Sequence, residues 1–153
     1  MKAKAMARPV LDQINIVSAN MAEAIAFYRL LGVEFPEVAT TKSGEPFHVS
    51  GKSGGETGLD LDSAEFAKVW NPAWKDDAKL GGRVVVGFSV ETREEVDRLH
   101  ATLTRAGYQS LNAPHDAFWG ARYAIVEDPN GLAVGLMSPQ NGEHRWPPEG
   151  WSG

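Results

Sequence analysis

The sequence predicts an α+β fold built from two tandem βαβββ units, and three observations predict it. The second half of the 153-residue chain echoes the first at an offset of 75 residues, so that Gly32 corresponds to Gly107. Upstream the offset is 72, so that Asn20 corresponds to Thr92. Each half also carries one helical pattern among several strand patterns. Because self-similarity at a fixed offset constrains a whole fold, we expect one duplicated unit.

The first repeat is predicted to begin with a strand at 10–17, where polar and apolar positions alternate. The segment 18–20 offers a turn and a helix cap. A helix follows, since apolar residues recur at helical spacing until Gly32 ends it. These apolar residues are Ala24, Phe27, Tyr28 and Leu31. Later strands are expected at 47–49 and 58–62, separated by the glycine-rich turn 52–55.

The second repeat is predicted to follow the same order. It begins with a strand at 84–90, and a helix is expected from about 93 to 106, ended by Gly107. The apolar side of this helix carries Val96, Leu99 and Leu103. The remaining strands are expected at 108–111, 122–127 and 133–137, with the turn 128–131 before the last.

We expect one globular unit with five segments along the chain. They are an N-terminal arm at 1–9, the first repeat at 10–66, a linker at 67–82, the second repeat at 83–139 and a tail at 140–153. Charges of both signs at 75–79 favour a solvated linker. The tail carries Trp146 and Trp151, so we expect it to pack across a subunit boundary or over the mouth of a cavity.

Composition excludes several classes of protein. An apolar fraction of 42% and a charged fraction of 23% are typical of globular chains. No apolar run is long enough to span a bilayer, and the N-terminus lacks the apolar stretch of a secretory signal, so we expect a cytoplasmic protein without a membrane partner. The absence of cysteine excludes disulfides and thiol chemistry. A net charge of −5 without a basic run argues against nucleic acid as a partner.

The βαβββ order and two motifs, Phe27-Tyr28 with Gly32 and the segment 127–131 (Glu-Asp-Pro-Asn-Gly), resemble the vicinal oxygen chelate superfamily. This superfamily includes glyoxalase I, extradiol dioxygenases, fosfomycin-modifying enzymes and bleomycin resistance proteins. The resemblance covers residues 10–139, and Phe118-Trp119-Gly120-x-Arg122 is most like the bleomycin-resistance and glyoxalase-like branch. It implies two curved mixed sheets that form a cupped site, with the helices outside.

The resemblance also implies four positions for a divalent metal, which become Gln13, Asp60, Val85 and Gly135. Placing these four toward the cup directs the apolar neighbours toward the helices. These neighbours are Ile14, Ile16, Leu59, Leu61, Val84, Val86, Leu132, Val134 and Leu136. Val85 and Gly135 have no side-chain donor, and an aspartate with a neutral amide makes a weak site. We therefore expect no cofactor. In the alternative, a protein that does bind a divalent metal, His48 and His115 are the candidates for substitute ligands.

Without a metal, the aromatic residues become the predicted binding groups. Phe118, Trp119, Trp70 and Trp74 would stack on a flat or conjugated ligand, while Arg122 or Asp60 orients its polar end. The other interpretation of the pair Trp70 and Trp74 is packing at the joint between the repeats or at a dimer contact. The predicted ligand-binding residues are Gln13, Asn15, Phe47, Asp60, Trp70, Trp74, Phe118, Trp119 and Arg122.

The sequence therefore favours a metal-free binding protein that captures an aromatic compound, as in antibiotic or toxin resistance, and that acts as a homodimer without catalytic residues. The alternative is a glyoxalase-like lyase or dioxygenase, in which Gln13, Asp60 and a substitute histidine hold a divalent metal. A third possibility, a metal-free enzyme with Asp60 as general base, lacks a paired acid or nucleophile in the sequence.

Overall fold

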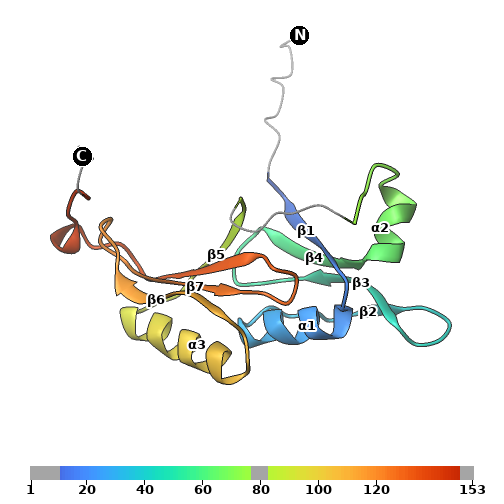
Figure 1. Ribbon diagram of the computed structural model, residues 1–153, viewed down its shortest axis with the longest axis horizontal. Helices are drawn as coiled ribbons and strands as arrows, with labels where there is room; N and C mark the ends of the chain where they lie inside the picture. Colours follow the sequence, from blue (N-terminus) through green and yellow to red (C-terminus); the bar gives the residue numbers. More distant parts are fainter. Residues whose placement is uncertain (1–10, 77–82, 149–153) are drawn as a thin grey trace, which may run out of the picture.

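The structure is a computed structural model that describes residues 11–76 and 83–148. These residues form two four-stranded mixed sheets and three α-helices. Helices α1 and α3 lie on the same side of the two sheets, and α2 lies at the far end of the first sheet (Figure 1). The α+β fold with two βαβββ units is therefore confirmed.

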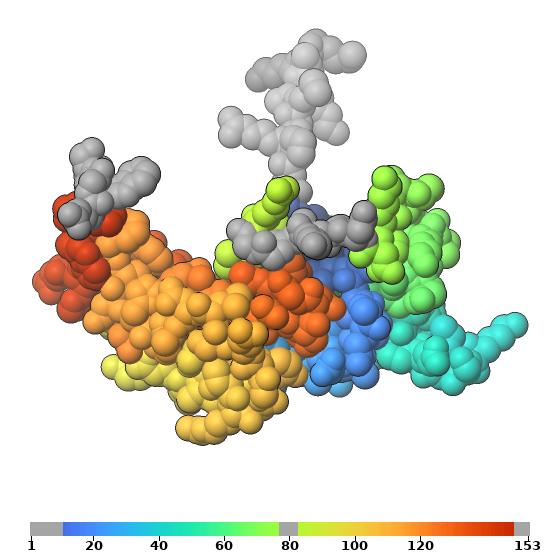
Figure 2. All heavy atoms as spheres, viewed as in Figure 1, coloured from blue at the N-terminus to red at the C-terminus, as the bar shows by residue number. Residues whose placement is uncertain are grey.

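The first repeat forms a sheet with the strand order β1-β4-β3-β2, in which β1 and β4 are parallel. Its elements are β1 (Gln13–Ser18), α1 (Met21–Leu30), β2 (Val38–Thr40), β3 (Pro46–Gly51) and β4 (Gly58–Ser63). The turn between β2 and β3 projects from the body of the molecule, drawn in cyan (Figure 2). Helix α2 (Ala64–Trp70) follows β4 directly.

The second repeat forms the equivalent sheet, with the strand order β5-β8-β7-β6 and parallel β5 and β8. Its elements are β5 (Val85–Ser89), α3 (Arg93–Arg105), β6 (Ser110–Asp116), β7 (Arg122–Glu127) and β8 (Ala133–Met137), followed by the 3-10 helix η1 (Gly142–His144). The predicted limits of β7 and β8 agree with the structure. No helix of the described ranges 11–76 and 83–148 is long and apolar enough to cross a membrane.

The register of the sheets shows the duplication directly. Gln13 pairs with Gly58 in the first sheet, and Val85 pairs with Ala133 in the second. The offset of 72 relates Gln13 to Val85 and the offset of 75 relates Gly58 to Ala133, so the two offsets convert one pair into the other. The helix caps are duplicated as well. The side chains of Asn20 and Thr92 each accept a hydrogen bond from the backbone N–H three residues later, at 3.1 Å. Gly32 and Gly107 follow the two helices with φ of 84° and 101°.

One apolar core spans both repeats. Phe27 and Tyr28 of α1 are fully buried, and Phe27 packs edge-on against Tyr108 of the second repeat with ring centroids 4.8 Å apart. The predicted alternation is confirmed at the buried positions Ile16, Leu59, Leu61, Val86, Leu132, Val134 and Leu136. Ile14 is half-buried and packs against the same core, whereas Val84 is 42% exposed, because the ladder with β8 begins only at Val85.

Sequence patterns missed the strand β2 and the helices α2 and η1, and they misplaced the strand β6. The edge strand β2 has only three residues, too few for a period to show. Helix α2 crosses the predicted boundary between the first repeat and the linker, and its N-cap Ser63 accepts a hydrogen bond from the Phe66 N–H at 3.2 Å. Strand β6 starts two residues later than predicted and runs to Asp116, with two register shifts against β7. The predicted arm at 1–9, part of the linker and Trp151 lie outside the described residues.

Candidate functional site

The face of the first sheet that points away from α1 is polar. Strand alternation places on it Gln13, Asn15, His48, Ser50, Asp60 and Asp62. In the sheet register, Asn15 lies opposite Asp60, and His48 lies opposite Asp62. Two of the predicted binding residues of this face, Gln13 and Asn15, are exposed on β1, while Asp60 is half-buried on β4.

Asp62 is the centre of a hydrogen-bonded network on this face. Its carboxylate is 2% exposed, accepts a hydrogen bond from Asn15 Nδ2 at 2.8 Å and lies 2.5 Å from His48 Nδ1. An ionised carboxylate only accepts, so Nδ1 carries the proton and donates a hydrogen bond to Asp62. This fixes the imidazole ring and directs Nε2 toward Ser50 Oγ, 3.4 Å away.

The second sheet carries a chain of aromatic rings on the corresponding face. Tyr123 on β7 lies edge-on to Trp119 with ring centroids 5.1 Å apart, and Trp119 lies edge-on to Phe118 at 5.0 Å. The ring of His115 on β6 lies 6.1 Å from Tyr123. We call Phe118, Trp119, Tyr123 and His115 the aromatic cluster. Its edge-to-face geometry is the favourable arrangement for aromatic rings.

Tyr123 also covers Gly135 on the neighbouring strand. A Cβ atom on Gly135 would lie 2.7 Å from the phenolic oxygen of Tyr123 and 3.1 Å from its ring, closer than atoms in contact allow. Gly135 itself is buried. The absence of a side chain at this position therefore makes room for the phenol ring.

The C-terminal tail holds the loop that carries Phe118 and Trp119. The backbone N–H of Trp146 donates to the Phe118 carbonyl at 2.8 Å, and the N–H of Asn141 donates to the Gly120 carbonyl at 3.0 Å. Gly120 has a φ of 93°, and a Cβ there would lie 2.2 Å from the Asn141 carbonyl oxygen. The described part of the tail thus packs against the aromatic cluster, with Trp146 itself 46% exposed.

Arg122 lies on the opposite face of the same strand. Its Nε donates to Asp97 of α3 at 3.0 Å, and its Nη1 donates to Asp116 at 3.2 Å. The hydrogen bond that Arg122 donates to Asp97 is the largest cause that raises the pKa of Arg122, and the hydrogen bond that Asp116 accepts from Arg122 in turn lowers the pKa of the Asp116 carboxyl. The structure therefore places the predicted ligand-orienting guanidinium in an ion-pair network beside α3.

Trp70 and Trp74, which were also expected beside the ligand, lie at the other end of the molecule from the aromatic cluster. Trp70 ends α2 and is 46% exposed, and Trp74 is half-buried in the turn that follows. The Lys68 ammonium lies 5.6 Å from the centre of the Trp74 ring, a cation–π contact that ties this ring to α2. Figure 1 shows α2 and the β6–β7 region at opposite ends of the long axis. These tryptophans and the aromatic cluster belong to separate sites.

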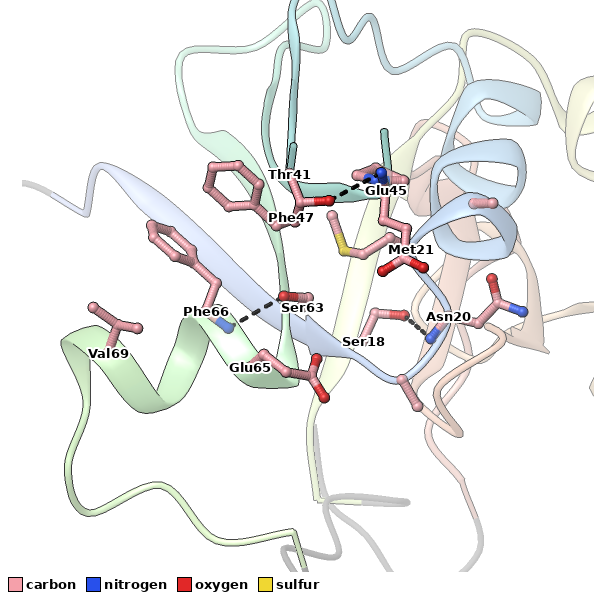
Figure 3. A pocket seen from close by; sticks show the side chains of 13 residues that line it. Ser18, Asn20, Met21, Thr41, Glu45, Phe47, Ser63, Glu65, Phe66 and Val69 are labelled. Atoms are coloured by element: carbon pink, nitrogen blue, oxygen red, sulfur yellow. Dashed lines mark hydrogen bonds between the residues drawn. The ribbon is translucent and has the colours of Figure 1, made fainter. Parts of the chain in front are cut away.

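Cavities lie beside the first sheet, and two of them are lined by candidate site residues. One, of about 700 Å³, lies between α1, the β2–β3 turn and α2. There Phe47 packs edge-on against Phe66 with centroids 4.9 Å apart, so the predicted ligand residue Phe47 lines this cavity (Figure 3). The other, of about 620 Å³, is lined by His48 and Ser50 together with Pro36, Glu37, Val38, Ala39 and Lys52.

A family model, described as the glyoxalase/bleomycin resistance protein/dioxygenase superfamily, matches residues 10–136. The chain belongs to this superfamily. None of the curated proteins compared with the chain matches it.

Solved structures with the superfamily fold are similar to the chain. A family enzyme from Burkholderia phytofirmans PsJN has 21% identity and a TM-score of 0.71, covering 84% of this chain and 97% of its own. A family protein from Nocardioides has 19% identity and a TM-score of 0.68, with 97% and 93% covered. TnmS3, an antibiotic binding protein from Streptomyces sp. CB03234, has 22% identity and a TM-score of 0.61, with 88% and 99% covered.

The donor set at the superfamily's metal positions does not fit a divalent metal. Val85 has no donor, and Gly135 lies under Tyr123. In both substitute ligands one ring nitrogen is already used, since His48 Nδ1 pairs with Asp62 and His115 Nδ1 lies 3.0 Å from the Ala113 carbonyl, so each ring keeps only Nε2 for a metal. Within 11–76 and 83–148, no three side chains among His, Cys, Asp and Glu are grouped so that they could hold a metal ion.

Sequence reasoning missed Tyr123 and Asp62, although alternation contained a signal for both. Asp62 is two residues from Asp60 and therefore shares its face. On β7 the buried residues Ala124 and Val126 mark the helix side, which assigns Arg122 to that side and Tyr123 to the other. The identity of their partners depends on strands far away in the sequence.

Proposed function

We propose that this superfamily member binds a flat aromatic small molecule without a metal ion, using the aromatic cluster of the second sheet. The observation that carries the proposal is Tyr123 lying over Gly135, where the resemblance implies a metal ligand. A position that would supply a donor atom in a metal-dependent relative instead accommodates a phenol ring. The surface offered to a ligand at this point is aromatic.

The geometry of the cluster suits stacking. Phe118 is 40% exposed, and Trp119 and Tyr123 are half-buried, so each ring keeps part of its surface for a ligand. Their mutual contacts and the tail already hold the loop, which lowers the entropy lost on binding. Each aromatic contact contributes about 0.5–1.5 kcal/mol beyond the burial of apolar area. His115 adds a polar edge beside Tyr123.

Capture of a compound by this fold has a precedent, since the structural neighbour TnmS3 is described as an antibiotic binding protein. We extend the proposal to sequestration of a toxic or antibiotic aromatic compound by a homodimer. Exposed apolar side chains at the start of β5 and directly before it support a subunit contact, with Val84 42% and Val85 46% exposed. Analytical ultracentrifugation of the wild type and of Val85→Lys tests the dimer, which the lysine should dissociate.

Calorimetric titration with a panel of planar aromatic compounds tests the binding function. Trp119→Ala should weaken binding about tenfold or more, because it removes a stacking ring. Trp70→Ala is the matched control, since this exposed tryptophan lies beside α2, and it should leave the affinity unchanged. Asp60→Ala should cost less affinity than Trp119→Ala.

The metal-dependent alternative makes opposite predictions. A lyase or dioxygenase that uses Gln13 and Asp60 would lose ligand binding in a chelator, and added Mn, Fe, Ni or Zn would raise its melting temperature. Elemental analysis of protein purified without chelators, combined with thermal melting, distinguishes the two. Near-stoichiometric metal with strong stabilisation would overturn the metal-free proposal.

A further inference from the structure

The polar network of the first sheet contains a serine, a histidine and an aspartate in hydrogen-bonding order. Ser50 Oγ lies 3.4 Å from His48 Nε2, and His48 Nδ1 lies 2.5 Å from Asp62 Oδ1. Neighbouring strands β3 and β4 supply the three residues, with His48 directly opposite Asp62 in the register. The proposed binding function does not use this arrangement.

The burial of Asp62 makes the network more than a surface hydrogen bond. The carboxylate is 2% exposed, and its second oxygen accepts the Asn15 amide at 2.8 Å. Both oxygens are therefore engaged, and the imidazole is held with Nδ1 protonated. In this tautomer Nε2 is the basic nitrogen, and it faces the Ser50 hydroxyl. A carboxylate that also stabilises the imidazolium form is the arrangement that lets a histidine accept a serine proton.

We infer that Ser50, His48 and Asp62 form an acyl-transfer site that acts on esters with a short apolar acyl group. Ser50 and His48 line the cavity of about 620 Å³. Pro36, Val38 and Ala39 give this cavity an apolar wall that suits an acyl chain. Lys52 lines it as well and supplies a cation for the oxyanion that forms on the carbonyl oxygen.

The reaction balances with water as the second reactant. Ser50 Oγ attacks the ester carbonyl carbon while His48 Nε2 takes the hydroxyl proton. The tetrahedral intermediate collapses, the bond from carbon to the leaving oxygen breaks, and His48 returns the proton to that oxygen. Water then attacks the acyl-serine and gives one proton to His48, which passes it to Ser50 Oγ as the carboxylic acid leaves.

The test uses p-nitrophenyl acetate and p-nitrophenyl butyrate with the whole 153-residue chain. The wild type should release a burst of p-nitrophenol close to one equivalent per site, and peptide mass spectrometry should find the acyl group on Ser50. Ser50→Ala should abolish the burst, and Asp62→Asn should slow acylation by about 100-fold or more. Ser53→Ala, an exposed serine in the next turn, is the matched control and should keep the full burst.

The labelling pattern separates this site from general imidazole reactivity. An acyl group found on a histidine or lysine instead of Ser50, or a Ser50→Ala protein that keeps its burst, would overturn the inference. Should Asp62→Asn fail to fold, the wild-type labelling and the Ser50→Ala comparison still decide. The binding test measures affinity for aromatic compounds and this test measures acylation of Ser50, so failure of this inference and failure of the proposed binding function are distinguishable.

Discussion

The phenol of Tyr28 donates a hydrogen bond to Asp128 at 2.7 Å across 100 positions of sequence. Tyr28 lies on α1 of the first repeat, and Asp128 begins the turn before β8 of the second. Both are buried, with 0% and 3% exposed. Asp128 also accepts hydrogen bonds from the backbone N–H groups of Asn130 at 2.7 Å and Leu132 at 2.9 Å. One carboxylate therefore shapes a turn and joins the two repeats.

Replacing Tyr28 by phenylalanine should lower the free energy of unfolding by about 1.5–3 kcal/mol, because a buried hydrogen bond to a charged group is lost. Urea unfolding followed by circular dichroism measures the change. Tyr108→Phe is the control, since the Tyr108 ring packs against Phe27 at 4.8 Å, and it should cost about 0.5 kcal/mol or less. Equal losses in the two variants would contradict the assigned role of the phenol.

Stability should also fall at alkaline pH because of Tyr28. Burial first, and then the neighbouring Asp128 charge, raise the pKa of the phenol above its ordinary value. The folded protein therefore keeps this proton at a pH where the unfolded chain releases it, so the stabilisation is complete below about pH 10 and is lost above it.

Urea unfolding at several pH values from 8 to about 11 measures this slope. Tyr28→Phe should be less stable at pH 8 but should lose less further stability than the wild type above about pH 10. Parallel pH profiles for the two proteins would assign the alkaline loss to other groups.

Gly135→Ala should displace the Tyr123 ring, because the new methyl group would lie 2.7 Å from the phenolic oxygen. Since a side chain yields more readily than backbone, we expect a modest stability loss of about 1 kcal/mol and a clear loss of aromatic-ligand affinity. In a Tyr123→Ala background the same substitution should cost little of either. Calorimetric titration and thermal melting of the four proteins complete this double-mutant cycle, and additive effects would contradict the contact.

Gly120→Ala should detach the tail from the aromatic cluster. The substitution combines a φ of 93° with a Cβ placed 2.2 Å from the backbone oxygen of Asn141, so the chain has to move. We expect a loss of about 2–3 kcal/mol. Gly44→Ala is the matched control, because it has a φ of 87° but no neighbouring atom within 4 Å, and it should cost only about 1 kcal/mol.

Faster hydrogen exchange at Trp146 should accompany the Gly120→Ala change, since the Trp146 N–H donates to the Phe118 carbonyl. Unchanged exchange at Trp146 would show that the tail is held by other contacts.

The sequence by itself determined the duplicated architecture. Helix caps such as Asn20 and Thr92, and terminating glycines such as Gly32, act on residues within one turn of themselves, so their patterns are visible without tertiary information. The offsets between the repeats also predicted that the two sheets share one register, because equivalent residues of a duplicated unit occupy equivalent positions.

Only the tertiary structure decided which side chains meet in the site. Asp62 contacts Asn15 and His48 because β4 lies between β1 and β3, an order that periodicity does not contain. Tyr123 covers Gly135 because β7 pairs with β8 in one register, and a change of one residue would reverse the faces. A local sequence pattern specifies helices, turns and the alternation of side chains along a strand. The contacts between side chains on neighbouring strands depend instead on how distant segments of the chain pack.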